Sequence, residues 1–134
     1  MPTPTETVMA FLAMLEQPGG FEAGIRAFFT EDCTYLNVGM SDTTGIEDSV
    51  AFIHAFEAQT GISTMTVDML AIAEVGDKVL TERIDNLHAA DGSLVMAPAV
   101  MGIFETRSGK ISGWRDYFDT LKAMGTATGG NLPQ

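Results

Sequence analysis

The spacing of apolar residues changes near residue 61, and this change restricts the fold more than any other feature of the chain. Before it, apolar residues recur at three- and four-residue steps, as in Val8, Phe11, Leu12 and Leu15, which is the repeat of an amphipathic helix. After it, runs of β-branched and apolar residues are separated by pairs of turn-forming residues, a pattern typical of consecutive strands. Helices first and strands afterwards predict an α+β fold in which the helices cover one face of a curved sheet.

We expect three helices and one strand in the front part. Thr3, Pro4 and Glu6 form a capping-box pattern with proline at the first helical position, so the first helix begins there and its apolar stripe ends near Pro18. A second helix is expected over about 21–29, followed by a strand over roughly 33–38. The pattern Thr44 to Glu47 predicts another capping box and a third helix that runs to about residue 59.

Four long strands in an antiparallel meander are expected in the rear part. Their boundaries are set by three turn pairs, Gly76–Asp77, Asp91–Gly92 and Ser108–Gly109. The third of these strands, residues 94–106, separates the strands that carry Asp85 and Asp116. No repeat or linker divides the chain, so residues 1–134 are expected to form one domain with a flexible, Gly-rich tail from about residue 122.

The formal charge of -11 and the pI of about 4.3 disfavour two classes of partner. Phosphate backbones and anionic membrane surfaces attract basic proteins, so no nucleic-acid or membrane partner is expected. No apolar stretch approaches the ~20 residues that span a bilayer. Cys33 is the only cysteine, which leaves no partner for an internal disulfide and favours a reducing, cytoplasmic location.

A charged pair, Arg83 and Asp85, interrupts an otherwise apolar strand face. Alternate residues of the extended segment 79–88 share a face, so both lie on the side that carries Val79 and Leu87. One interpretation is an exposed salt bridge, which is common and weak. The other is a polar island inside a cavity.

Asp116 lies between two large aromatic residues, Trp114 and Phe118, on one face of the last strand. Burial raises the pKa of a carboxyl and disfavours its ionised form unless a cation or hydrogen-bond donors compensate. Arg83 is the candidate cation, since the strands of Asp85 and Asp116 are expected to be two spacings, ~10 Å, apart. A concave sheet would let both carboxyl groups reach one guanidinium.

On the early strand, Tyr35 and Asn37 are also two residues apart and share one face with Cys33. A phenol and an amide that point the same way can hold one water molecule. A buried tyrosine bonded to an asparagine is also ordinary core structure. The pair therefore gains weight only in combination with the charged residues.

The segments "TYLNV", "LTERIDNL", "VMGIFE" and "WRDYFD" resemble the limonene-1,2-epoxide hydrolase family, part of the nuclear transport factor 2-like and SnoaL-like superfamily. The resemblance extends from the first helix to Asp119. It implies a cone-shaped domain in which a curved, mixed, six-stranded sheet and three to four N-terminal helices enclose a deep apolar pocket. It also implies a homodimer.

The same resemblance implies roles for five residues. Arg83, Asp85 and Asp116 match the family's Asp-Arg-Asp triad, and Tyr35 and Asn37 match its water-binding tyrosine and asparagine. The implied activity is one-step hydrolysis of a small hydrophobic epoxide, of limonene oxide or cyclohexene oxide type, to a vicinal diol. No cofactor or metal is expected.

Opening an epoxide with water needs a base on the water and an acid on the departing oxygen, which two carboxyl groups of opposite protonation can supply. Asp116 is assigned as the base and Asp85 as the acid. Leu87, Trp114 and Phe118 are expected to line the substrate pocket, although simple core packing is an equal alternative for each.

Two other functions fit the same fold. A ketosteroid-isomerase-like or polyketide-cyclase-like enzyme would use one Asp to abstract a carbon-bound proton, and a cation such as Arg83 between two carboxyl groups argues against it. A non-catalytic module would bind a hydrophobic ligand and keep Arg83 and Asp116 as a structural ion pair. A serine hydrolase is not expected, because the chain lacks a Gly-x-Ser-x-Gly motif and holds only two histidines, His54 and His88.

Overall fold

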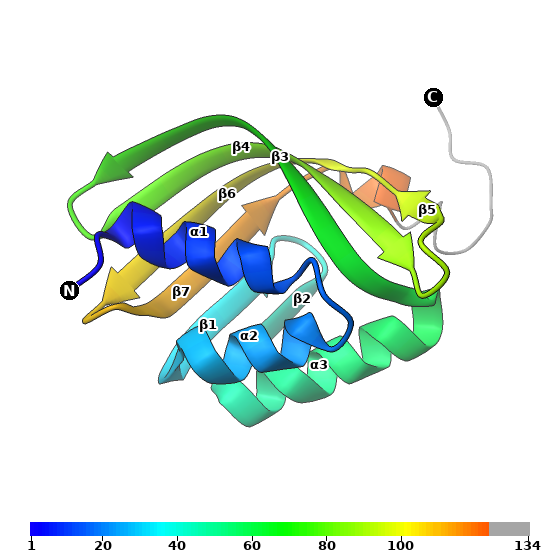
Figure 1. The fold of residues 1–134 in the computed structure, drawn as a ribbon, viewed down its shortest axis with the longest axis horizontal. Helices are drawn as coiled ribbons and strands as arrows, with labels where there is room; N and C mark the ends of the chain where they lie inside the picture. The colour runs from blue at the N-terminus through cyan, green and yellow to red at the C-terminus, as the bar shows by residue number, and fades with distance from the viewer. Residues whose placement is uncertain (124–134) are drawn as a thin grey trace.

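The computed structural model describes residues 1–123, in which the helices pack against one face of a curved sheet (Figure 1). The helices are α1 (Pro4–Met14), α2 (Gly20–Phe28) and α3 (Ile46–Thr60). The predicted capping box of α1 is confirmed: Thr3 Oγ1 accepts from the Glu6 backbone N–H, and the Glu6 carboxylate accepts from the Thr3 N–H. The apolar stripe of α1 is buried against the sheet.

The predicted capping box of the third helix is wrong. Thr44 is extended and belongs to a strand, and the glycine that follows it, Gly45, occupies the N-cap position with φ 91°. The Asp48 carboxylate accepts from the Thr44 N–H. Glu47 instead pairs with Arg26 of α2 at 2.7 Å, so the sequence pattern identified the start of the helix but not the groups that cap it.

The sheet follows the order β2-β1-β7-β6-β4-β3, and β5 pairs only with β4. The strands are β1 (Phe29–Asn37), β2 (Ser41–Thr44), β3 (Ile62–Val75), β4 (Lys78–Ala89), β5 (Leu94–Met96), β6 (Ala99–Arg107) and β7 (Lys110–Tyr117). Strands β3, β4, β6 and β7 form the predicted antiparallel meander. Because β1 pairs in parallel with β7, the sheet is mixed, as the resemblance implied. It has seven strands rather than the expected six, because β5 adds to β4.

Three strand predictions need correction. The first strand begins at Phe29 rather than near Cys33, because it follows α2 directly and α2 ends at Phe28. The expected strand 94–106 is divided into β5 and β6 at Pro98, which has no N–H for the ladder and accepts through its carbonyl from the Asp85 N–H. Strand β2 was not predicted, because its polar sequence Ser-Asp-Thr-Thr carries no apolar alternation.

The core between the helices and the sheet is aromatic. The ring of Phe11 on α1 meets Phe29, Phe104 and Trp114 at centroid distances of 5.3–6.4 Å. No helix within residues 1–123 is long and apolar enough to cross a membrane. The predicted flexible tail lies outside the described residues except for its first two positions, which belong to a short helical segment that begins at Thr120.

Candidate active site

A cavity of about 370 Å³ lies between the helices and the inner face of the sheet. Its helical wall includes Phe21, Phe52 and Phe56 and is apolar except for Gln59. Its sheet wall contains the sequence-predicted residues Leu87, Trp114 and Phe118 together with five polar side chains, those of Tyr35, Asn37, Ser41, Asp85 and Asp116. A few convergent polar groups in an apolar cavity are typical of a small-molecule site.

Arg83 lies directly behind this wall and is completely buried. The alternation predicted for β4 is observed, since Val79, Thr81 and Asp85 are buried on the same face. The exposed-salt-bridge interpretation is therefore wrong. A fully buried guanidinium needs anionic partners, because its desolvation otherwise costs several kcal/mol.

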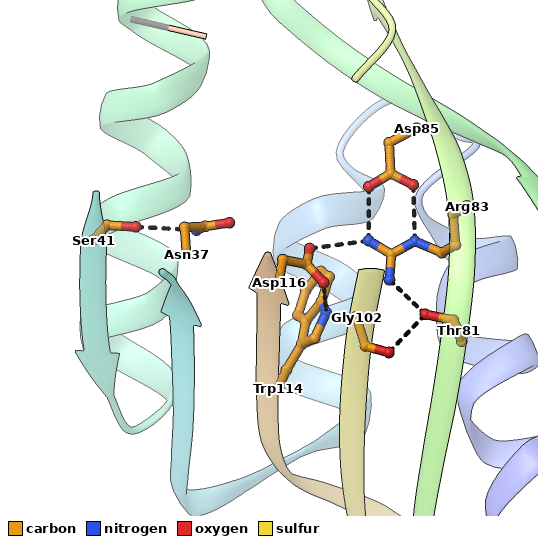
Figure 2. A network of polar contacts seen from close by, with 8 residues as sticks. All are labelled: Asn37, Ser41, Thr81, Arg83, Asp85, Gly102, Trp114 and Asp116. Atoms are coloured by element: carbon orange, nitrogen blue, oxygen red, sulfur yellow. Dashed lines mark hydrogen bonds and ion pairs between the residues drawn. The ribbon is translucent and has the colours of Figure 1, made fainter. Parts of the chain in front are cut away.

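Two carboxyl groups share this guanidinium (Figure 2). Arg83 donates from Nε to Asp85 Oδ1 at 2.9 Å and from Nη2 to Asp85 Oδ2 at 2.7 Å. The same Nη2 donates to Asp116 Oδ2 at 3.0 Å. Burial lowers the pKa of Arg83, but its bonds to Asp85 and the charges of both carboxyl groups raise it above its ordinary value, so Arg83 stays charged.

Thr81 fixes the third side of the guanidinium. Its Oγ1 accepts from Arg83 Nη1 at 2.9 Å and donates to the Gly102 carbonyl at 2.9 Å. The sequence placed Thr81 on the correct strand face but gave it no role, because a threonine in a strand is ordinary. With Thr81, each guanidinium nitrogen of Arg83 donates to a neighbouring side chain.

Asp116 is held at both of its oxygens. Trp114 Nε1 donates to Oδ1 at 2.8 Å, while Oδ2 accepts from Arg83. Burial raises the pKa of the Asp116 carboxyl to about 6, although Arg83 and Trp114 lower it. The sequence predicted Trp114 as a pocket residue and missed its hydrogen bond, which depends on the rotamers of both side chains.

Tyr35 and Asn37 adjoin Asp116 because β1 runs parallel to β7 in a register that pairs Tyr35 with Trp114 and Asn37 with Asp116. The Tyr35 ring stacks on Trp114 at 4.4 Å. Asn37 Nδ2 donates to Ser41 Oγ at 3.0 Å, which leaves the amide oxygen as an acceptor. Burial raises the pKa of the Tyr35 phenol above its ordinary value, so its hydroxyl remains protonated.

The structure thus brings four of the five predicted polar residues into the wall of one cavity and places the fifth, Arg83, behind that wall. Arg83, Asp85 and Asp116 form a hydrogen-bonded chain, and the tyrosine and asparagine of β1 lie beside the Asp116 end of that chain. Two buried carboxyl groups on one guanidinium, in an apolar cavity of an α+β domain, can differ in protonation and so supply an acid and a base to one bound molecule.

The chain belongs to the limonene-1,2-epoxide hydrolase family, whose catalytic-domain model matches residues 2–128. It is 35% identical over 112 residues to the epoxide hydrolase EphG of Mycobacterium tuberculosis, a match that covers 84% of this chain and 70% of that protein. A solved limonene-1,2-epoxide-hydrolase-like enzyme from M. tuberculosis is 29% identical with a TM-score of 0.71, covering 95% of this chain and 90% of the other.

The fold itself is shared more widely. A protein of ketosteroid-isomerase-like fold from Catenulispora acidiphila matches with a TM-score of 0.73 at 22% identity, covering 98% of this chain and 96% of that one. A SnoaL-like polyketide cyclase fold from Jannaschia matches with a TM-score of 0.72 at 17% identity, over 98% and 97% of the two chains. These two likenesses establish the nuclear transport factor 2-like fold and no activity.

Proposed function

We propose that this protein adds water to a small hydrophobic epoxide in one step of general acid and base catalysis and releases a vicinal diol. The observation that carries the proposal is the buried chain Asp85–Arg83–Asp116 at the polar end of an apolar cavity. If both carboxyl groups were ionised, this buried set would hold one excess negative charge. Desolvation favours one shared proton, which leaves one carboxylate and one carboxylic acid.

Asp116 is the proposed base. It is the carboxyl group that adjoins Tyr35 and Asn37, whose hydroxyl and amide oxygen would fix the attacking water beside it. A base acts best when its pKa lies near the working pH, and burial raises that of Asp116 to about 6. The water would give its proton to Asp116 as its oxygen attacks an epoxide carbon.

Asp85 is the proposed acid, which gives its proton to the epoxide oxygen as the C–O bond breaks. It lines the same cavity from β4, across β6 from Asp116. Arg83 donates to both oxygens of Asp85, which fixes the orientation of the carboxyl group. In this proposal Asp85 holds the shared proton while Asp116 is ionised, since the two roles need opposite protonation.

No covalent intermediate is part of the proposal. Enzymes that attack an epoxide with a carboxylate need a second base to hydrolyse the ester. The two histidines of the chain lie elsewhere: His54 pairs with Glu22 on the helical surface, and His88 contacts Thr66 at the end of β4. Neither lines the cavity.

The cavity indicates the size and polarity of the substrate. Its volume of about 370 Å³ is at the lower end of the range for small-molecule sites, which suits an epoxide of limonene oxide or cyclohexene oxide type. Leu87, Trp114 and Phe118 would contact the carbon skeleton. The apolar wall offers such a substrate no charged group except at the end where the ring would open.

Incubation of the purified protein with cyclic, terpenoid and aryl epoxides, with diol measured by chromatography, tests the activity. We expect diol from at least one cyclic epoxide in the presence of a metal chelator. Exchange of a ketone's α-hydrogen into solvent, without any diol, would favour the ketosteroid-isomerase-like or polyketide-cyclase-like alternative. Ligand binding without turnover would favour a binding module.

Trp114→Phe is expected to raise the pKa of Asp116, because the indole N–H that stabilises its carboxylate is lost. Hydrogen bonds to charged groups contribute about 1.5–3 kcal/mol, or about one to two pKa units, so we expect kcat/KM to fall roughly 2- to 15-fold at pH 7. The acid limb of the pH profile should also move upward. A lower activity with an unmoved pH profile would show that Trp114 acts through packing alone.

The outer face of the sheet is the proposed homodimer interface. The helices cover the other face (Figure 1), and Leu80, Met101 and Tyr117 are 37%, 53% and 48% exposed on the neighbouring strands β4, β6 and β7. A cluster of apolar side chains on an uncovered sheet face is a common protein interaction site.

The acidic, cysteine-poor composition suits the cytoplasm, which remains a prediction.

Met101→Glu is expected to convert a dimer into a monomer at micromolar concentration, because it places a charge in the apolar interface. Met9→Glu, an equivalent change on the exposed side of α1, should leave the dimer unchanged. Sedimentation equilibrium measures both. A wild-type monomer, or a Met101→Glu dimer, would contradict this interface.

A further inference from the structure

A glycine lies at the point where the Arg83 side chain crosses the sheet. Across the inner face, Thr81 on β4 is in register with Gly102 on β6, and Gly102 is in register with Asp116 on β7. Figure 2 shows Gly102 on β6, between β4 and β7 and below the hydrogen bond that joins Arg83 to Asp116. A buried glycine inside a strand weakens the strand, and it often marks a close approach of another group to the backbone.

The space that a side chain would occupy at Gly102 is already filled. A Cβ built on this residue would lie 2.3 Å from Arg83 Nη1 and 2.4 Å from Asp116 Oδ1. Both distances are shorter than contacts that real Cβ atoms make. Even a methyl group therefore cannot coexist with the observed positions of the guanidinium and the carboxylate.

The two atoms cannot easily move aside. Arg83 Nη1 is bonded to Thr81 Oγ1, which is itself anchored on the carbonyl of Gly102. Asp116 Oδ1 is bonded to the indole N–H of Trp114. Displacement of either atom breaks a buried hydrogen bond and leaves a polar group without its partner.

We propose that Gly102 is a positioning residue, whose missing side chain lets the Arg83 guanidinium cross β6 and hold Asp116 and Asp85 together. Its importance for turnover rests on the proposed function, whereas its effect on the ion pair does not. Gly102 does not touch the substrate in this account. It acts only through Arg83 and Asp116.

The charges around Asp116 give this role a measurable signature. The titratable groups that face Asp116 are Arg83 and Asp85 from β4 and Tyr35 from β1. Arg83 is the one positive group among them, and it lowers the pKa of Asp116 against the effect of burial. A side chain at position 102 that separates Arg83 from Asp116 should therefore raise the pKa of Asp116 further.

The test compares Gly102→Ala with Gly113→Ala. Gly113 is a second buried glycine on the adjoining strand β7, where an added Cβ would meet its nearest atoms at an ordinary 3.5 Å. Carboxyl ¹³C NMR of each protein, with the Asp116 signal assigned from Asp116→Asn, gives the pKa directly. We expect an upward shift of about one unit or more in Gly102→Ala and no shift in Gly113→Ala.

Turnover is measured in parallel on an epoxide that the wild-type protein hydrolyses. Gly102→Ala should lower kcat/KM by on the order of 100-fold, since misplacement of a catalytic group by ~1 Å has such an effect. A folded Gly102→Ala protein with an unshifted Asp116 pKa would overturn the inference. If the wild-type protein makes no diol, the proposed function fails, and the NMR titration still decides the role of Gly102.

A double-mutant cycle covers the case in which Gly102→Ala does not fold. Arg83→Met removes one of the two atoms that the new methyl group strikes and releases Asp116 from its bond to the guanidinium, so the double variant should fold at pH 5. Thermal unfolding compares the double variant with Arg83→Met alone. A full loss of folding in the double variant would assign Gly102 to general packing and would overturn its link to Arg83.

Discussion

Asp116→Asn and Asp85→Asn are each expected to lower kcat/KM by about 100- to 10,000-fold, the range over which a single proton-transfer group contributes. An amide at position 116 cannot accept the proton of the attacking water. An amide at position 85 is too weak an acid to protonate the departing oxygen. Both variants should stay folded, because asparagine keeps the shape of aspartate and can still accept a hydrogen bond from Arg83.

Asp77→Asn is the matched control for these two variants. Asp77 lies in the exposed turn between β3 and β4, where its carboxylate only approaches Lys78 at 3.7 Å, so its activity should equal that of the wild type. Circular dichroism and thermal unfolding establish that each variant is folded. Activity near the wild-type value in Asp85→Asn or Asp116→Asn would contradict the role assigned to that residue.

The pH dependence follows from the raised pKa of Asp116. A base works only when it is ionised, so activity should be present above pH 6 and fall as the pH drops through about 6. The two carboxyl groups share Arg83, and the measured acid limb therefore belongs to the coupled pair. An acid limb near pH 4 would indicate that burial does not act on Asp116 as the structure implies.

Arg83→Met is expected to destabilise the protein by about 3–5 kcal/mol at pH 8 and to abolish activity. Removal of one partner from a buried ion pair leaves the other charges buried without compensation, and here two carboxyl groups lose the same cation. Without Arg83 the folded-state pKa of Asp116 should rise further above its unfolded value. Stability is then greatest at low pH and is lost as the pH rises through that pKa.

Arg107→Met is the control for this stability measurement. Its ion pair with Asp32 lies on the surface, with side chains 57% and 67% exposed, and water and salt screen such a pair so that it contributes little to stability. Urea unfolding at pH 5 and pH 8 compares the two variants with the wild type. Equal effects of Arg83→Met and Arg107→Met would mean that the buried network contributes little to the fold.

Much of the fold follows from local patterns in the sequence. The stripe of α1, its capping box and the alternation of β4 are encoded within a few residues, and all three are observed. The parallel pairing of β1 with β7 joins segments far apart in the chain, and only the family resemblance implied a mixed sheet. Strand β2 was not predicted, because its polar residues show no alternation of apolar and polar positions that would indicate its pairing with β1.

The sequence identified most residues of the candidate active site but only part of their geometry. Arg83, Asp85 and Asp116 stood out because charged residues on an apolar strand face need an explanation, and the structure brings them together. Thr81 and Gly102 had no such signal, since their roles depend on how one guanidinium crosses a neighbouring strand. Register and rotamers decide such contacts, and neither can be read from residue types.

The proposed hydrolase activity rests on the polar set, because the fold alone is compatible with several activities. Ketosteroid-isomerase-like and SnoaL-like structures share the fold at 22% and 17% identity. A proton shuttle on carbon uses an apolar oxyanion site, whereas Arg83 here places a fixed positive charge between two carboxyl groups. A fixed positive charge suits two carboxyl groups of which one is protonated and the other is ionised.

The most direct test of the central claim is a single-turnover reaction in ¹⁸O-labelled water, with protein in excess over a cyclic epoxide that it hydrolyses. Direct attack by water held at Asp116 predicts one labelled oxygen in the diol of the first turnover, and Asp116→Asn should give no diol under the same conditions. An unlabelled diol, with label entering a protein carboxylate instead, would show a covalent ester intermediate and would contradict the one-step mechanism.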